Sequence, residues 1–207
     1  MSLDPTNLGD LFRRDFDFNQ VALIDLGGES SPREFTFAQL DAMANAVARG
    51  LDQLALLPGT RIGILSANRA EFIASYLGIM RAGLVAVPVN YKFSQKMIDF
   101  VLADSGAQLV FCDALRAPQI PSTLPKIVFN QNNSEGFEHF INPGPYCSVI
   151  PKPDQIAMIL YTSGSSGQPK GVMLSHQSHI WVAKTRLGKN NWSKHRFLIA
   201  APMYHMN

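Results

Sequence analysis

The chain has 207 residues, of which 46% are hydrophobic and 16% charged, and its net charge is +2. This length suffices for one α/β domain with a sizeable core, and the composition excludes intrinsic disorder. The small net charge gives no reason to expect a nucleic-acid-binding surface. The cysteines, Cys112 and Cys147, are too few for a disulfide framework.

Targeting signals are not expected. Charged residues interrupt the start of the chain, which argues against a signal peptide. The longest apolar stretch, 72–89, contains Arg81 and Gly83 and changes its period midway. This pattern indicates a helix followed by a strand, and not a membrane span. The expected location is the cytoplasm.

The first elements in chain order are a short amphipathic helix over 7–16 and a strand over 21–26, with 33–35 pairing back onto it. A longer helix follows, because Thr36 and Gln39 have the capping-box spacing. Its apolar stripe recurs at helical steps: Leu40, Ala44, Val47, Leu51 and Leu54.

Strands and helices then alternate. Strands are predicted over 61–65, 84–89, 108–112 and 126–129. The intervening helices are expected to be capped at Asn68 and Ser94 and closed by Gly83 and Gly106. Such alternation predicts right-handed crossovers, and so an α/β fold whose mostly parallel sheet carries helices on both faces. No Gly-x-Gly-x-x-Gly follows any of these strands, which discounts a Rossmann cofactor site.

The second half begins with a surface connection over 130–153, with one short helix near Glu138. Strands are expected over 156–160 and 172–174, a helix from Ser175 or His176 to Leu187, and a last strand over 196–200.

Between two of these strands lies the string Tyr161-Thr-Ser-Gly-Ser-Ser-Gly-Gln-Pro-Lys-Gly-Val172. Its small residues let backbone N–H groups turn toward one point, and its hydroxyls and ammonium add further donors. Such a cluster favours a polyphosphate anion. The candidate ligands are Thr162, Ser163, Gly164, Ser165, Ser166, Gly167 and Lys170. A Walker P-loop is excluded, because Pro169 and Gly171 occupy its diagnostic places. The alternative is a flexible surface hairpin.

The string resembles the phosphate-binding signature of the adenylate-forming superfamily, which covers acyl-CoA synthetases, peptide-synthetase adenylation domains and luciferases. In that family the loop holds the β- and γ-phosphates of ATP while a carboxylate attacks the α-phosphate. The segment 81–90 resembles a second family stretch, in a form more typical of acyl-CoA synthetases. The terminal Pro202-Met-Tyr-His205 resembles the family segment beside the acyl pocket, which assigns Tyr204 and His205 to that pocket. The alternative for His205 is an ordinary loop histidine.

The resemblance implies that residues 1–207 are the N-terminal portion of the large domain of an AMP-binding enzyme. It implies ATP, Mg²⁺ and CoA as cofactor and co-substrates, and a carboxylic acid as substrate. The family's magnesium-binding glutamate, ribose-binding aspartate and C-terminal catalytic lysine have no counterpart here. We therefore expect the chain alone to be inactive, and no catalytic residue is assigned.

Other readings stay open at this point. The chain can belong to another branch of the family, such as a peptide synthetase or a luciferase-like enzyme, or it can be a nucleotide-binding module without catalysis. It can also be a structural piece whose loop is merely flexible, which nucleotide titration would distinguish. His176 and His179 are not expected to bind a metal, because no cysteine or carboxylate cluster accompanies them.

Overall fold

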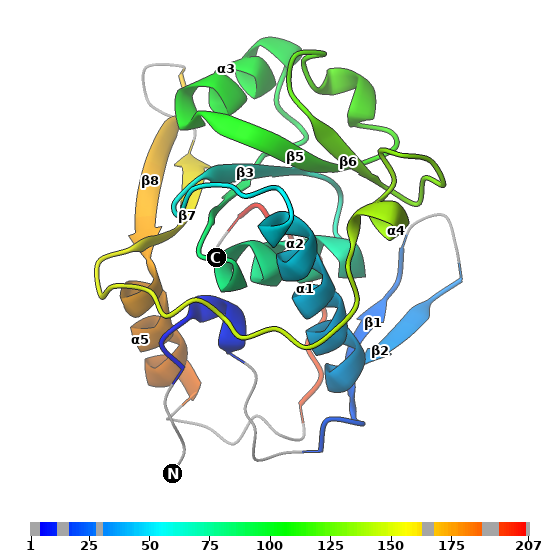
Figure 1. Ribbon diagram of the computed structural model, residues 1–207, viewed down its shortest axis with the longest axis vertical. Coiled ribbons are helices and arrows are strands. Elements are labelled where there is room, and N and C mark those ends of the chain that lie inside the picture. The colour runs from blue at the N-terminus through cyan, green and yellow to red at the C-terminus, as the bar shows by residue number, and fades with distance from the viewer. Residues whose placement is uncertain (1–4, 12–16, 28–30, 163–167, 188–194, 206–207) are drawn as a thin grey trace.

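The computed structural model describes residues 5–11, 17–27, 31–162, 168–187 and 195–205. Its centre is a six-stranded sheet with the order β6-β5-β3-β4-β7-β8, in which only the β7–β8 pair is antiparallel (Figure 1). The strands are β3 (Arg61–Leu65), β4 (Val85–Pro88), β5 (Ala107–Asp113), β6 (Lys126–Phe129), β7 (Ile156–Thr162) and β8 (Lys170–Ser175). The prediction of a mostly parallel α/β sheet is confirmed.

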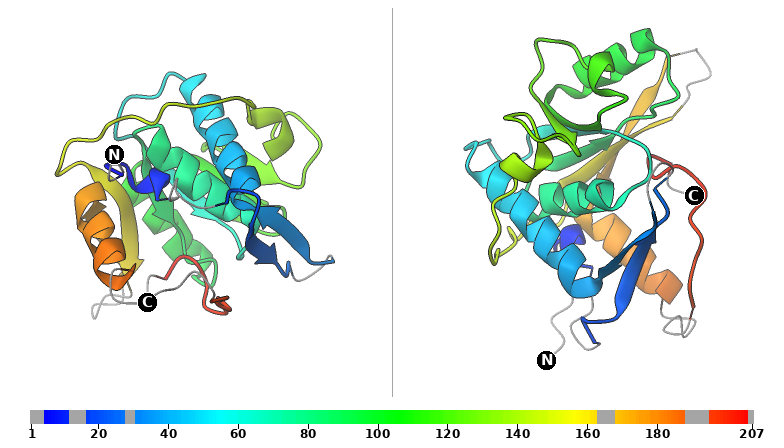
Figure 2. Two further views of the ribbon diagram at one scale, coloured as in Figure 1. Left: turned by 90° about the horizontal axis from the view of Figure 1, so that it is seen from below. Right: turned by 90° about the vertical axis from the view of Figure 1, so that its right-hand side faces the viewer.

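Helices cover both faces of the sheet (Figure 2). One face carries η1 (Leu8–Asp10), α1 (Phe37–Asp52), α2 (Ala70–Arg81), α4 (Phe137–Phe140) and α5 (His176–Leu187). The other face carries α3 (Gln95–Ser105) and η2 (Ala117–Gln119). Strand β5 shows the alternation that separates the two layers, since Phe111 packs into the first core and Val110 into the second.

The start of α1 is the predicted capping box. Thr36 Oγ1 accepts a hydrogen bond from the Gln39 N–H at 3.1 Å, and Gln39 Oε1 accepts one from the Thr36 N–H at 2.8 Å. Two orphan donors of the first turn are satisfied in this way. The apolar stripe is confirmed as far as Leu51, but Leu54 lies beyond the helix and is 47% exposed.

Two predicted N-caps differ from the structure. The N-cap position of α2 is Arg69 and not Asn68, whose side chain is used elsewhere. Ser94 occupies the N-cap position of α3, but its side chain makes no capping hydrogen bond. Gly106 closes α3 with φ +63, in the left-handed conformation that glycine adopts without strain.

An antiparallel hairpin precedes the sheet. It pairs β1 (Val21–Asp25) with β2 (Arg33–Thr36), as predicted. The expected connection over 130–153 contains the short helix α4 and leads into β7, which pairs with β4. The connection therefore joins strands of one sheet.

Two expected elements are corrected. Of the helix expected over 7–16, the described part contains only the 3-10 turn Leu8–Asp10, and 12–16 lie outside the described residues. The strand expected over 196–200 is wrong. These residues are exposed and pair with no described strand, so the apolar run has no ladder to join. In the described ranges, no helix combines the length and apolarity needed to cross a membrane.

Candidate active site

The candidate site lies at the carboxyl edge of the parallel strands. Strands β3 and β4 are neighbours, but the chain returns from β4 across β3 to reach β5. The strand order therefore reverses between β3, which leads to β4 on one side, and its neighbour β5, which leads to β6 on the other. In open α/β sheets, ligands bind in the crevice outside the carboxyl ends of the strands at such a reversal.

One part of the site is the junction of β7 and β8. Strand β7 runs parallel to β4 and ends at Thr162, so Thr162 lies at the carboxyl edge. The register pairs Thr162 directly with Lys170, the first residue of β8, and both residues are exposed. The hydroxyl and the ammonium thus stand at the two ends of one loop. The other predicted phosphate ligands, Ser163, Gly164, Ser165, Ser166 and Gly167, lie outside the described residues.

The first end of this loop is anchored to α3. The Tyr161 hydroxyl donates a 2.6 Å hydrogen bond to Asp104 Oδ2. Burial raises the pKa of Tyr161, and the Asp104 carboxylate raises it further, so the phenol stays protonated as a donor. Gly171 pairs with Tyr161 across the strands, and a Cβ on Gly171 would lie 3.1 Å from the tyrosine ring. A glycine there leaves room for the ring.

A second part of the site is the segment Ala201–His205. Pro202 to His205 form a turn, in which the His205 N–H donates to the Pro202 carbonyl at 3.0 Å. The Asn68 amide holds this turn from the end of β3. Its Nδ2 donates to the Ala201 carbonyl at 2.9 Å, and its Oδ1 accepts from the Met203 N–H at 2.8 Å.

The two predicted acyl-pocket residues are placed differently. Tyr204 is buried and packs edge-on against Tyr91, with ring centroids 5.3 Å apart, while His205 is exposed. Burial raises the pKa of Tyr204. Arg116 lies over the other ring of this pair, with its guanidinium carbon 4.5 Å from the centroid of Tyr91. Residues that follow β4 and β5 therefore converge on the segment that Asn68 holds.

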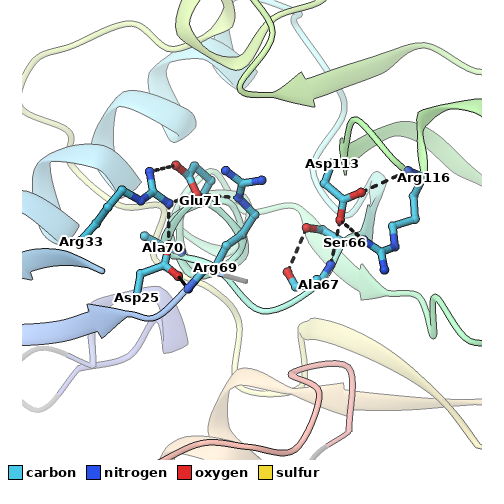
Figure 3. A network of polar contacts seen from close by, with 10 residues as sticks. Asp25, Arg33, Ser66, Ala67, Arg69, Ala70, Glu71, Asp113 and Arg116 are labelled. Carbon is cyan, nitrogen blue, oxygen red and sulfur yellow. Dashed lines mark hydrogen bonds and ion pairs between the residues drawn. The ribbon is translucent and has the colours of Figure 1, made fainter. Parts of the chain in front are cut away.

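The loop that carries Asn68 is fixed on both sides (Figure 3). On one side, Asp113 accepts a hydrogen bond from the Ala67 N–H at 2.9 Å and pairs with Arg116. On the other side, Asp25 accepts from the Ala70 N–H at 3.1 Å. These contacts leave the loop little freedom to shift relative to the sheet.

Glu71 completes this network. It is buried and binds Arg33 at 2.7 Å and Arg69 at 2.7 Å, while Arg33 also binds Asp25 at 2.6 Å. Burial alone would raise the pKa of Glu71, but hydrogen bonds from Arg33 and Arg69 outweigh it and lower the pKa to about 2. Glu71 is therefore ionised at neutral pH.

Sequence reasoning missed four residues at this edge: Asn68, Tyr91, Asp113 and Arg116. Each lies at or just beyond the carboxyl end of a predicted parallel strand. That position is the signal by which they can be found, because side chains there face the ligand-binding edge of an α/β sheet.

His176 has a structural place away from this edge. It is buried at the start of α5, and its Nδ1 accepts a 3.0 Å hydrogen bond from the Leu8 N–H. Burial lowers the pKa of His176 to about 4, so the ring is neutral at physiological pH. The ring thus joins α5 to η1, which also packs on α2.

The chain resembles known proteins over most of its length. The family described as "AMP-binding enzyme" matches residues 14–207. Gramicidin S synthase 2 of Brevibacillus brevis is 33% identical over 165 residues, which cover 80% of this chain and 4% of that protein. The long-chain-fatty-acid–CoA ligase FadD13 of Mycobacterium tuberculosis is 30% identical over 187 residues, which cover 86% of this chain and 37% of that protein.

A solved structure resembles the fold. The crystal structure of the anthranilate CoA ligase AuaEII in complex with anthranoyl-AMP matches with a TM-score of 0.76 and 26% identity. The match covers 87% of this chain and 36% of AuaEII. The chain therefore spans well under half the length of these relatives.

Proposed function

The chain belongs to the AMP-binding enzyme family, and on this basis we propose that it is the N-terminal part of the large domain of an AMP-forming acid–CoA ligase. In the proposed reaction a carboxylate attacks the α-phosphate of ATP, which gives an acyl-adenylate and pyrophosphate. The thiol of CoA then loses its proton and attacks the acyl carbon, the C–O bond between this carbon and the adenylate breaks, and AMP leaves with the oxygen. The products are an acyl-CoA thioester and AMP.

The phosphate end of this site is assigned to the loop between β7 and β8. Thr162 and Lys170 close the loop at the carboxyl edge, and the residues between them supply the remaining hydroxyl and N–H donors. The Lys170 ammonium would offset negative charge as pyrophosphate departs. Such fixed charges act in the transition state without reorganisation.

The acid end is assigned to the turn that carries Tyr204 and His205. The turn lies where the strand order reverses, beside Asn68 and Tyr91. Tyr204 is packed against its neighbours, while His205 is accessible to a ligand. Positioning the carboxylate against ATP is the main demand of this chemistry, since it converts a bimolecular encounter into an oriented one.

Mg²⁺ is the cation that would neutralise the triphosphate in such a reaction. Among the described residues, however, no group of three or more Asp, Glu, His or Cys side chains is gathered as a metal site. No described residue of this chain is therefore assigned to Mg²⁺.

The observation that carries the proposal is the Thr162–Lys170 pairing, which closes a donor-rich loop at the ligand-binding edge. CoA as acceptor is favoured by FadD13 and AuaEII, which are CoA ligases by name. A second candidate is a peptide-synthetase adenylation domain, with a carrier-protein thiol as acceptor. It is favoured by the 33% identity to gramicidin S synthase 2.

The test uses the natural protein that contains these residues. ATP–pyrophosphate exchange is measured with fatty acids, aryl acids and amino acids in turn, and thioester formation is then measured with CoA and with a phosphopantetheinylated carrier protein. We expect exchange with a fatty or aryl acid, and AMP release with CoA. Exchange with amino acids alone, together with transfer only to the carrier, would support the second candidate. No exchange with any acid would refute both.

A further inference from the structure

The side-chain amide of Asn68 contacts the turn of Ala201–His205 at two points. It donates to the Ala201 carbonyl at 2.9 Å and accepts from the Met203 N–H at 2.8 Å. These two backbone groups lie on alternate residues. A strand residue pairs with a neighbouring strand through the same donor-and-acceptor pattern. The amide of Asn68 thus replaces a backbone partner for the turn.

Few side chains can make this pair of contacts. An amide has a donor and an acceptor on one short, planar group. A carboxylate at the same place could accept from Met203, but its second oxygen would face the Ala201 carbonyl, and two acceptors repel. An alanine could make neither bond. The contact therefore depends on asparagine chemistry and not merely on a polar residue.

Asn68 is itself held in place. The flanking N–H groups of Ala67 and Ala70 donate to Asp113 and Asp25, which belong to β5 and β1. Arg69 is bound by the buried carboxylate of Glu71. The backbone on both sides of Asn68 is thus tied to other elements through Ala67 and Ala70 (Figure 3). The amide of Asn68 is therefore a fixed point that holds the turn.

The turn has a second contact beyond Asn68. Tyr91, which follows β4, packs edge-on against Tyr204, and Arg116 lies over the Tyr91 ring. His205 follows directly, with its ring centroid 4.6 Å from that of Tyr204. The position of the His205 ring therefore depends on how the turn is held at Ala201, Met203 and Tyr204.

We propose that Asn68 is a positioning residue for the carboxylic acid, because it sets the turn that presents Tyr204 and His205 at the strand reversal. This role rests on the proposed function. Asn68 does not touch the acid in this account. It acts through the backbone of Ala201 and Met203, and so it should affect the handling of the acid and not that of ATP.

The test compares the natural protein with its Asn68→Ala and Asn68→Asp variants in ATP–pyrophosphate exchange. We expect the KM for the acid to rise about tenfold in Asn68→Ala, the scale of one to two net hydrogen bonds, while the KM for ATP stays within about twofold. The KM for the acid should rise at least as much in Asn68→Asp, although the aspartate keeps an oxygen that can accept from the Met203 N–H. An Asn133→Ala variant is the matched control, because that amide accepts from the Glu135 N–H in an exposed turn away from Ala201–His205.

A second measurement tests the contact without activity. Hydrogen exchange of the Met203 amide should be slow in the natural protein, at least about tenfold faster in Asn68→Ala, and unchanged in Asn133→Ala. An unchanged acid KM, or equal rises in both KM values, would overturn the positioning role. Unchanged Met203 exchange would overturn the contact itself. If the natural protein shows no acid-dependent ATP–pyrophosphate exchange, the proposed function fails, and the acid-positioning role fails with it. This holds even if the Met203 amide is protected from hydrogen exchange.

Discussion

Replacement of Glu71 by glutamine tests the network that fixes the loop of Asn68. Glu71 is 4% exposed and neutralises two cations, Arg33 and Arg69. In Glu71→Gln, Asp25 remains as an acidic partner of Arg33, but Arg69 loses its carboxylate. Loss of one partner of a buried ion pair leaves the other charge poorly solvated.

The magnitude follows from the pKa of Glu71. It is lowered from 4.5 to about 2, so ionised Glu71 stabilises the folded state by about 3 kcal/mol at neutral pH. A folded-state pKa below the unfolded one means that this contribution is complete above pH 4.5 and is lost as the pH falls through about 2. Breaking a buried pair commonly costs about 3–5 kcal/mol, and the low end applies because the Arg33 side chain is 36% exposed and can hydrate.

The assay is urea-induced unfolding at several pH values between 7 and 2. We expect Glu71→Gln to be about 3 kcal/mol less stable at pH 7, and the difference to shrink toward zero near pH 2. Glu34→Gln is the control, because Glu34 is an exposed carboxylate in the same hairpin, and it should change stability by less than about 0.5 kcal/mol. If the gap between the natural protein and Glu71→Gln stayed constant over this pH range, the assigned pKa shift would be wrong.

Three further predictions concern the loop and α5. Lys170→Ala should slow pre-steady-state adenylate formation about ten- to a hundredfold, because the proposed charge-assisted contact with the phosphates would be lost. An unchanged rate would refute the assignment of Lys170 to the phosphate site. Tyr161→Phe should destabilise the protein by about 1–2 kcal/mol in urea unfolding, because the Asp104 carboxylate loses its 2.6 Å donor, and equal stability would contradict that anchor. As the pH falls from 6.5 toward 4, the free energy of unfolding should drop, because residue 176 is protonated in the unfolded chain before the buried His176 ring is protonated in the folded protein. The His176→Gln variant should lack this part of the pH dependence. An identical slope of the free energy of unfolding against pH in both proteins would disprove this role of His176.

The fold can be predicted from the sequence where the local chemistry of a segment and its packing favour the same structure. The Thr36–Gln39 box, the glycine at 106 and the short apolar runs of the parallel strands each have a mechanism that acts within a few residues. The structure confirms these features. The apolar run 196–200 shows the opposite case, because an apolar segment becomes a strand only when it pairs with a neighbouring strand, and the described residues show no such pairing for this run.

Asn68 shows why part of the site could not be predicted. A residue of this type before a helix is a common N-cap, so local chemistry predicted a cap. The partners that it has instead, Ala201 and Met203, lie far along the chain. Only the fold brings them together. The phosphate loop between Thr162 and Lys170 could be proposed from the sequence because its candidate donors are contiguous. The supports of the turn could not, because they come from the ends of separate strands.

The contact between His176 and Leu8 has a consequence for synthesis. The two residues are 168 positions apart, and at about 5–20 residues per second the ribosome needs roughly ten to thirty seconds to make the second after the first. During that interval β3, α2 and β4 are also made, and the N-terminal turn can pack on α2 through the contacts of Asn7 and Gly9 with Met80 and Arg81. Only the hydrogen bond to His176 has to wait for α5. This contact therefore forms after the turn has already found its place on α2.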